Sequence, residues 1–135
     1  MIKKVLLIED DEFIRELYKR QLDMGGLFFT YAFSNGNDGL KAALENQYDL
    51  ILLDIMLPGM NGLDILRNIK QNEARKNTPV ILISNLGQEA VIKEGYALGA
   101  IGYLVKATFT PDQIVQRITT ILEQNATPTE DLGLP

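Results

Sequence analysis

Short unbroken runs of apolar residues alternate along this chain with longer segments in which apolar residues recur every three or four positions. Four of the runs have the length and the β-branched content of strands that are buried on both faces of a sheet. These runs are residues 5–8, 50–53, 80–83 and 101–105. A fifth candidate, residues 27–33, is richer in aromatic side chains, which favours a strand nearer the edge of the sheet.

The first segment between these runs has the spacing of an amphipathic helix. Its apolar stripe consists of Ile14, Leu17, Tyr18 and Leu22. Its polar side consists of Arg15, Glu16, Lys19 and Arg20. The glycine pair at positions 25 and 26 is expected to end this helix.

The later helices have start signals of their own. Asn37 or Asp38 is expected to open the second helix, and Asn61 is expected to open the third. The fourth, residues 88–98, has the weakest helical pattern because Gly95 interrupts it. The last helix combines an N-cap, a proline in the first helical position and a capping-box glutamine, at Thr110, Pro111 and Gln113.

Five strand–helix units in series predict an α/β fold with a parallel sheet, right-handed crossovers and helices on both faces. A (βα)5 doubly wound sheet commonly has the flavodoxin-like strand order 2-1-3-4-5, with strands one and three side by side where the winding reverses. The 135 residues fit one domain, since a domain has about 150 residues. We expect this domain to span residues 1–125 and residues 126–135 to form a flexible C-terminal tail or a truncated linker.

Composition removes several classes of function. A formal net charge of -5 leaves no electrostatic footprint for a phosphate backbone, so we expect no direct nucleic-acid binding. The chain has no cysteine and no histidine, which excludes disulfides, thiolate or imidazole metal ligands, and a phosphohistidine on this chain. No apolar run approaches the about eighteen residues of a membrane span, and the run after Lys3 and Lys4 is too short for a signal peptide. We expect a cytoplasmic protein with no membrane insertion.

The residues with useful chemistry gather where the predicted strands end. They are Glu9 and Asp10 after strand one, Asp54 after strand three, Ser84 after strand four and Lys106 after strand five. Ligands of open parallel sheets bind beyond these carboxyl ends, where the winding reverses. Carboxylates from strands one and three would repel each other by roughly 4 kcal/mol per pair at about 4 Å, so a counter-ion is expected. Oxygen ligands with room for water favour Mg²⁺.

The same arrangement suits a phosphoryl group bonded to Asp54. Aspartate is a covalent acceptor of phosphoryl groups, a divalent ion polarises phosphoryl oxygens, and lysine supplies a compact positive charge. Each residue also has an ordinary structural explanation by itself. An acid after strand one can cap a helix, Asp54 can form an Asx-turn, serine is common at strand exits, and Lys106 can be solvated. The joint placement at neighbouring strand ends favours the functional interpretation.

At these residues the chain resembles the receiver domains of two-component response regulators, including the single-domain chemotaxis type. The resemblance covers about residues 3–123 and rests on the motifs VLLIEDDE at 5–12, DIMLPGMNG at 54–62, PVILIS at 79–84 and GAIGYLVK at 99–106. It implies that Asp54 is the phosphoacceptor and that Asp10 and Asp54 hold Mg²⁺ directly. It also implies that Glu9 helps through water and that the backbone carbonyl of Met56 completes the protein ligands.

The resemblance further implies a switch. Ser84 would turn inward to bind the phosphoryl group, and Tyr103 would swing in behind it. Lys106 would hold the phosphoryl oxygens. The movement would remodel the face formed by helix four, strand five and helix five.

Two departures from the family pattern concern neighbours of the site. Ala107 follows Lys106 where the family usually has a proline after a cis peptide bond. Either the surroundings enforce a cis bond, at a cost of about 2.5–4 kcal/mol, or Lys106 sits differently. Asn85 follows Ser84 where a smaller residue is common, which would narrow access or add a hydrogen bond.

A third departure concerns the lifetime of the phosphorylated form. Met56 and Leu86 lie two residues past Asp54 and Ser84, respectively. Both are apolar where some relatives of the family carry polar groups that guide the hydrolytic water. We therefore hypothesise a long-lived phosphorylated form.

The expected function is that of a phosphoacceptor regulatory domain, not an enzyme, which assists its own phosphorylation and slow dephosphorylation. The donor would be a histidine kinase or a phosphotransfer protein, because this chain has no histidine. Residues after 123 are too few for an output domain, so the output would be binding of a downstream protein to the face described above. The domain would act as a monomer or as an activation-dependent dimer.

The main alternative is a pseudo-receiver, which would bind proteins without ever being phosphorylated. The presence of the full set of site residues argues against it. A phosphohydrolase of this fold would need an Asp-x-Asp pair, whose first position is occupied here by Glu9. A flavin-binding module would need a Ser/Thr-rich loop after strand one, and P-loop and Gly-x-Gly-x-x-Gly signatures are also missing from the sequence.

Overall fold

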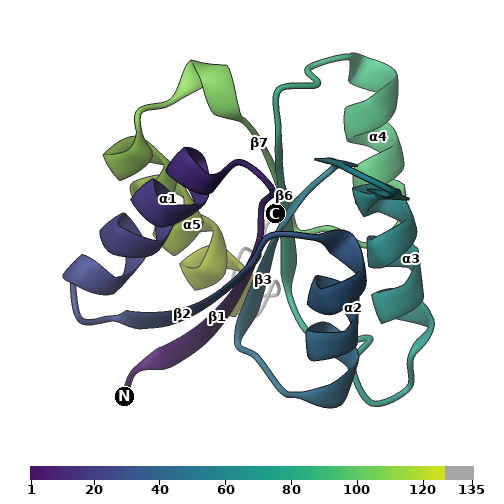
Figure 1. Ribbon diagram of the computed structural model, residues 1–135, viewed down its shortest axis with the longest axis horizontal. Helices are drawn as coiled ribbons and strands as arrows, with labels where there is room; N and C mark the ends of the chain where they lie inside the picture. Colours follow the sequence, from purple (N-terminus) through teal and green to yellow (C-terminus); the bar gives the residue numbers. More distant parts are fainter. Residues whose placement is uncertain (127–135) are drawn as a thin grey trace, which may run out of the picture.

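A parallel sheet lies between two layers of helices in the computed structural model, which describes residues 1–126 (Figure 1). The strands of this sheet are β1 (Lys3–Ile8), β2 (Phe28–Phe33), β3 (Leu50–Asp54), β6 (Val80–Ser84) and β7 (Gly102–Val105). Their order is β2-β1-β3-β6-β7, and every neighbouring pair is parallel. Since β6 and β7 are the predicted fourth and fifth strands, the predicted doubly wound order 2-1-3-4-5 is confirmed, with the aromatic strand β2 at an edge.

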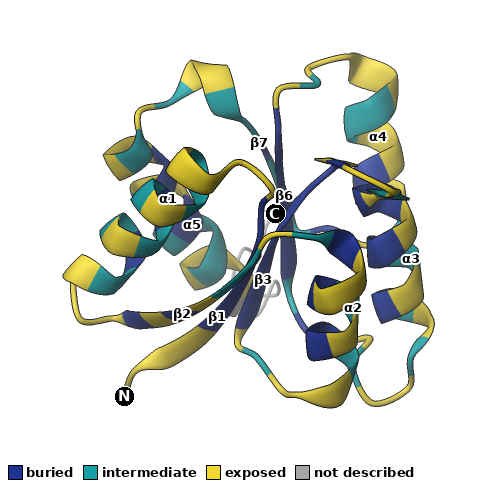
Figure 2. Cartoon of the chain, viewed as in Figure 1, coloured by how far each residue is buried: buried dark blue, intermediate teal, exposed yellow. Residues whose placement is uncertain are grey.

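The helices divide between the two faces of the sheet (Figure 1). One face is covered by α1 (Glu12–Met24) and α5 (Pro111–Ala126), and the other by α2 (Gly36–Glu45), α3 (Gly62–Gln71) and α4 (Glu89–Ala97). A 3-10 turn, η1 (Lys106–Thr108), follows β7. Successive side chains of a strand point to opposite faces, so Val5 and Leu7 join the core under α1 and α5 while Leu6 and Ile8 join the core under α2 and α3. The central strands are therefore buried on both sides, which explains their unbroken apolar runs (Figure 2).

Most of the predicted helix starts are confirmed. Asn61 caps α3 by accepting a hydrogen bond from the backbone N–H of Leu63. At α5, the Thr110 backbone N–H donates to the Gln113 side chain, and the Gln113 N–H donates to the Thr110 hydroxyl, which is the predicted capping box. The prediction that Asn37 or Asp38 opens the second helix is wrong. These two residues lie inside α2, and Asn35 is the cap.

Two further local features add to the sequence-based picture. Residues 56–57 (β4) and 60–61 (β5) form a short antiparallel hairpin between β3 and α3, which the sequence pattern did not indicate. Gly95, which weakened the prediction of the fourth helix, is buried in α4. A Cβ atom there would lie 2.6 Å from the Leu82 side chain, so glycine allows the helix to approach the sheet.

Two of the expectations concern the C-terminal tail and membrane insertion. Helix α5 runs to Ala126, and most of the predicted tail, residues 127–135, lies outside the described residues. Among residues 1–126, no helix is long and apolar enough to cross a membrane.

Candidate functional site

Three carboxylates meet at the carboxyl edge of the sheet. Glu9 and Asp10 follow β1, Asp54 ends β3, and the register that pairs Ile8 with Leu53 brings them together. One carboxylate oxygen from each residue lies within 4.8 Å of those of the other two. Glu9 and Asp54 are buried, whereas Asp10 is exposed. Four metal ligands are predicted, three side chains and one backbone carbonyl, and the structure brings the three side chains together.

Lys106 closes this acidic cluster from the end of β7. Its Nζ lies 2.8 Å from Asp54 Oδ2 and 2.6 Å from Glu9 Oε1. Burial alone would lower the pKa of the Lys106 ammonium, but its hydrogen bond to Asp54, its close contact with Glu9 and the negative charges of both carboxylates together raise it. The peptide bond between Lys106 and Ala107 is trans, and Lys106 still reaches the cluster, so the site needs no cis bond after this lysine.

Glu9 is the most deeply buried member of the cluster. Burial raises the pKa of its carboxyl, although Lys106 and the backbone N–H of Asp11 act in the opposite direction. Oε2 accepts a hydrogen bond from that N–H at 3.0 Å. Oε1 is buried and meets Lys106 only as an ion pair, without a hydrogen bond of good geometry. This oxygen can therefore accept a further electropositive partner.

The donor set fits a hard divalent cation. All three side chains offer oxygen, one of them is open to solvent, and Glu9 Oε1 is buried without a hydrogen bond. Few carboxylates with access to water suit Mg²⁺, which usually keeps several water ligands. The residues present are thus compatible with the predicted magnesium site.

Asp54 is held in place by the turn that follows β3. Its Oδ1 accepts a hydrogen bond from the backbone N–H of Met56 at 3.1 Å, and its Oδ2 accepts one from Lys106. Gly62 returns the chain to this turn and donates its N–H to the Ile55 carbonyl at 2.8 Å. A Cβ atom on Gly62 would collide with the Asp54 carbonyl oxygen and lie 2.6 Å from the Ile55 Cα. The approach therefore requires glycine.

Ser84 and Tyr103 both bond to the backbone of Leu86 beside the site instead of lying in the acidic cluster. Ser84 ends β6, next to β3, and its buried Oγ accepts a hydrogen bond from the backbone N–H of Leu86 at 3.1 Å. The Tyr103 hydroxyl donates to the backbone carbonyl of Leu86. Its ring lies against Gly95 of α4, and burial raises the pKa of its hydroxyl. The two predicted switch residues are thus linked through Leu86.

For two residues near the site, the sequence pattern predicts only which side of a helix they occupy. Arg15 was assigned to the polar side of the first helix, but its guanidinium turns back and donates to the Glu9 carbonyl at 3.0 Å. Tyr18 was assigned to the apolar stripe, and it is indeed buried. Burial also raises the pKa of its hydroxyl, which feels the charges of Lys106, Glu9 and Asp54. Helical periodicity says which side of a helix a residue occupies, but not how a long side chain bends.

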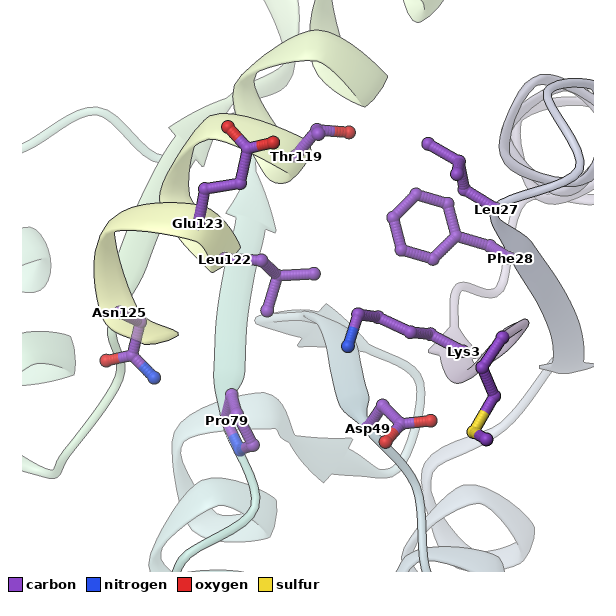
Figure 3. A pocket seen from close by; sticks show the side chains of 10 residues that line it. Lys3, Leu27, Phe28, Asp49, Pro79, Thr119, Leu122, Glu123 and Asn125 are labelled. Atoms are coloured by element: carbon purple, nitrogen blue, oxygen red, sulfur yellow. The ribbon is translucent and has the colours of Figure 1, made fainter. Parts of the chain in front are cut away.

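A separate pocket lies at the other end of the sheet, near the amino ends of the strands (Figure 3). It has a volume of about 340 Å³ and is lined by residues at the starts of strands and near the end of α5, among them Lys3, Phe28, Pro79 and Leu122. Lys3 and Phe28 begin β1 and β2, whereas the acidic cluster lies where β1 and β3 end. The pocket is therefore not part of the acidic site.

A doubly wound five-stranded sheet with an acidic cluster and an opposing lysine at its carboxyl edge is the architecture of the receiver class of signalling domains. The sequence profile of the response regulator receiver domain matches residues 5–119, so this chain belongs to that family. Receiver domains are regulatory modules of two-component systems that take a phosphoryl group from histidine kinases and generally bind Mg²⁺ at an acidic pocket.

Individual relatives agree with this assignment. The chain is 38% identical over 129 residues to the transcriptional regulatory protein YkoG of Bacillus subtilis (strain 168). The aligned residues make up 96% of this chain and 55% of that protein. The chain spans about half the length of the curated relatives it matches. Among solved structures, the BeF3-activated receiver domain of DrrB from Thermotoga maritima has 31% identity and a TM-score of 0.79, covering 91% of this chain and 99% of that one. The chemotaxis response regulator CheY4 of Vibrio cholerae has 25% identity and a TM-score of 0.81, covering 90% and 99%.

Proposed function

We propose that this domain accepts a phosphoryl group on Asp54 from a phosphohistidine of a partner histidine kinase or phosphotransfer protein. The observation that best supports this is the geometry around Asp54. Its buried carboxylate is fixed by Met56 and Lys106 and lies beside two further carboxylates. A carboxylate oxygen of Asp54 attacks phosphorus, a P–O bond forms, and the P–N bond to the donor imidazole breaks. The imidazole nitrogen keeps the electron pair of that bond.

The other site residues divide the work of charge compensation and orientation. Asp10, Asp54 and the backbone carbonyl of Met56 would hold Mg²⁺ directly, and Glu9 would act through water. In that position Mg²⁺ would supply positive charge that offsets the negative charge of the phosphoryl oxygens during transfer. Lys106 binds a phosphoryl oxygen with the ammonium that now pairs with Asp54. Ser84 binds another with its hydroxyl once that hydroxyl leaves the Leu86 N–H.

The output would be a change in protein binding at the face of α4, β7 and α5. Movement of Ser84 breaks its hydrogen bond with the Leu86 N–H, while the Tyr103 hydroxyl keeps its hydrogen bond to the Leu86 carbonyl. Tyr103 also lines a hollow of that face together with Tyr96, Ile101 and Arg117. A displacement at Leu86 therefore reaches a surface that a downstream protein can bind. YkoG is named as a transcriptional regulatory protein, which is compatible with an output of this kind.

Incubation with acetyl phosphate and Mg²⁺, followed by intact mass measurement, tests the proposal. The wild-type chain should gain the mass of one phosphoryl group, and Asp54→Asn should gain none. Asp64→Asn is the matched control, since Asp64 is an exposed aspartate on α3 that pairs with Arg67. An unmodified wild-type chain under a large excess of donor would contradict the proposal and favour a binding module that is never phosphorylated.

A further inference from the structure

Arg15 makes an unusual contact for an arginine on the first turn of a helix. Its Nη1 donates to the backbone carbonyl oxygens of both Glu9, at 3.0 Å, and Asp10, at 3.2 Å. Within the described part of the chain it forms no ion pair, although acidic residues surround it in the sequence at positions 11, 12 and 16. One guanidinium nitrogen thus ties together the two peptides that carry the first two members of the acidic cluster.

This contact matters most for Asp10. Glu9 has other constraints, since its N–H donates to the Phe33 carbonyl at 3.0 Å and its carboxylate accepts the Asp11 N–H. The Asp10 side chain is exposed, and among residues 1–126 its carboxylate accepts no hydrogen bond. The direction of that carboxylate therefore depends on the backbone of the loop between β1 and α1, and Arg15 holds this backbone.

We propose that Arg15 is a positioning residue for the cation site, acting through the backbone of Glu9 and Asp10 to direct the Asp10 carboxylate toward Asp54. This inference rests on the proposed function, because it assumes that the acidic cluster binds Mg²⁺. Arg15 does not touch the cation or the phosphoryl group. It reduces the number of loop conformations that binding must select, as outer partners of metal ligands do.

The sign of one measurement separates positioning from a simple charge effect. If Arg15 acted only through its positive charge, its removal would tighten binding of Mg²⁺, because one cation near the site would be lost. If Arg15 acts by holding the loop, its removal weakens binding. We expect Arg15→Met to raise the dissociation constant for Mg²⁺ about tenfold, measured by calorimetric titration with MgCl2.

Two further variants make the test specific. Arg15→Lys keeps the charge and can reach a carbonyl oxygen, so it should recover part of the loss. Arg20→Met removes the same charge from an exposed position on the same helix and should leave the affinity within about twofold of wild type. The Mg²⁺ concentration for half-maximal phosphorylation by acetyl phosphate should rise with Arg15→Met, while the rate at saturating Mg²⁺ returns toward that of wild type. A purely structural role would not move this midpoint.

The outcomes are distinct. Unchanged or tighter binding by Arg15→Met, or equal weakening by Arg20→Met, would overturn the inference. If Arg15→Met fails to fold, Arg15→Lys decides the matter, since unchanged affinity in that variant overturns the inference and a partial loss supports it. A wild-type chain that binds no Mg²⁺ and takes no phosphoryl group would instead contradict the proposed function.

Discussion

Lys106 is the positive partner of two buried carboxylates, Glu9 and Asp54. Its side chain is only 14% exposed, and those of its partners are 1% and 4% exposed, so solvent screens these ion pairs weakly. Removing one partner of such a buried group leaves the opposite charges uncompensated. The lysine therefore stabilises the site before any phosphoryl group arrives.

Lys106→Met should lower the free energy of unfolding by about 3 kcal/mol in buffer without Mg²⁺, because Glu9 and Asp54 then repel each other without a counter-ion. Added Mg²⁺ should restore more stability to this variant than to wild type, since the ammonium no longer repels the cation. Urea unfolding with and without MgCl2 measures both effects. Lys93→Met is the control, because its ion pair with Glu89 is largely exposed and should contribute less than about 1 kcal/mol. Equal stability of Lys106→Met and wild type without Mg²⁺ would contradict this account.

Met56 bears on the lifetime of the phosphorylated form. It follows Asp54 by two residues, and its side chain is 58% exposed, so it lies where water approaches the site without offering that water a hydrogen bond. Met56→Asn supplies an amide that can orient the attacking water. One added hydrogen bond of about 1.4 kcal/mol in the transition state corresponds to roughly tenfold faster loss of phosphate.

The decay of phosphorylated protein after removal of the donor, followed by intact mass, checks this prediction. Met24→Asn is a matched control, since Met24 is 65% exposed at the end of α1. If Met56→Asn loses phosphate no faster than wild type, the hypothesis of a long-lived phosphorylated form through this position is wrong.

Among the elements, the turn between β3 and α3 depends most strongly on a single residue. Gly62→Ala places a methyl group against the Asp54 carbonyl and the Ile55 backbone, which cannot move without shifting the end of β3. We expect a loss of about 3 kcal/mol in stability and slower phosphorylation, because the Asp54 carboxylate moves with its backbone.

Gly25→Ala is the contrasting variant. Nothing lies within 4 Å of its would-be Cβ and its φ is -80°, so it should be neutral or slightly stabilising. Thermal unfolding and phosphorylation rates of both variants test this difference.

The elements also show which local features a sequence pattern can predict. A short apolar run located β1, and helical spacing with cap residues located α3 and α5, because burial of side chains and hydrogen bonding of the helix ends depend on local sequence there. The hairpin of β4 and β5 has two residues in each strand, which is too short for any period to show. The start of α2 was misplaced because residues 35, 37 and 38 are all good capping types, and only the path of the chain after β2 selects Asn35.

For the molecule as a whole, strand order explains most of what was predictable about the site. Once β1 and β3 are neighbours, residues 45 positions apart such as Glu9 and Asp54 must meet, and Lys106 follows from β7 ending at the same edge. The backward bend of Arg15 and the hydrogen bonds of Ser84 and Tyr103 to the Leu86 backbone were not predictable in this way. They depend on side-chain rotamers and on loop geometry, which have no sequence period.

Binding of Mg²⁺ should stabilise the whole fold, because the acidic cluster exists only when β1 and β3 are paired. A ligand that binds the native state alone adds RT ln(1 + [L]/Kd) to the free energy of unfolding, which is about 1.4 kcal/mol at ten times Kd. For a domain of this size we expect the midpoint of thermal unfolding to rise by about 5 °C.

KCl at matched ionic strength should not reproduce the rise, because it screens the carboxylates without bridging them. Asp10→Asn should abolish most of the rise, and Asp64→Asn, on the surface of α3, should retain it. An equal rise in both variants would mean that Mg²⁺ acts through general surface charge and not through the cluster that joins the two central strands.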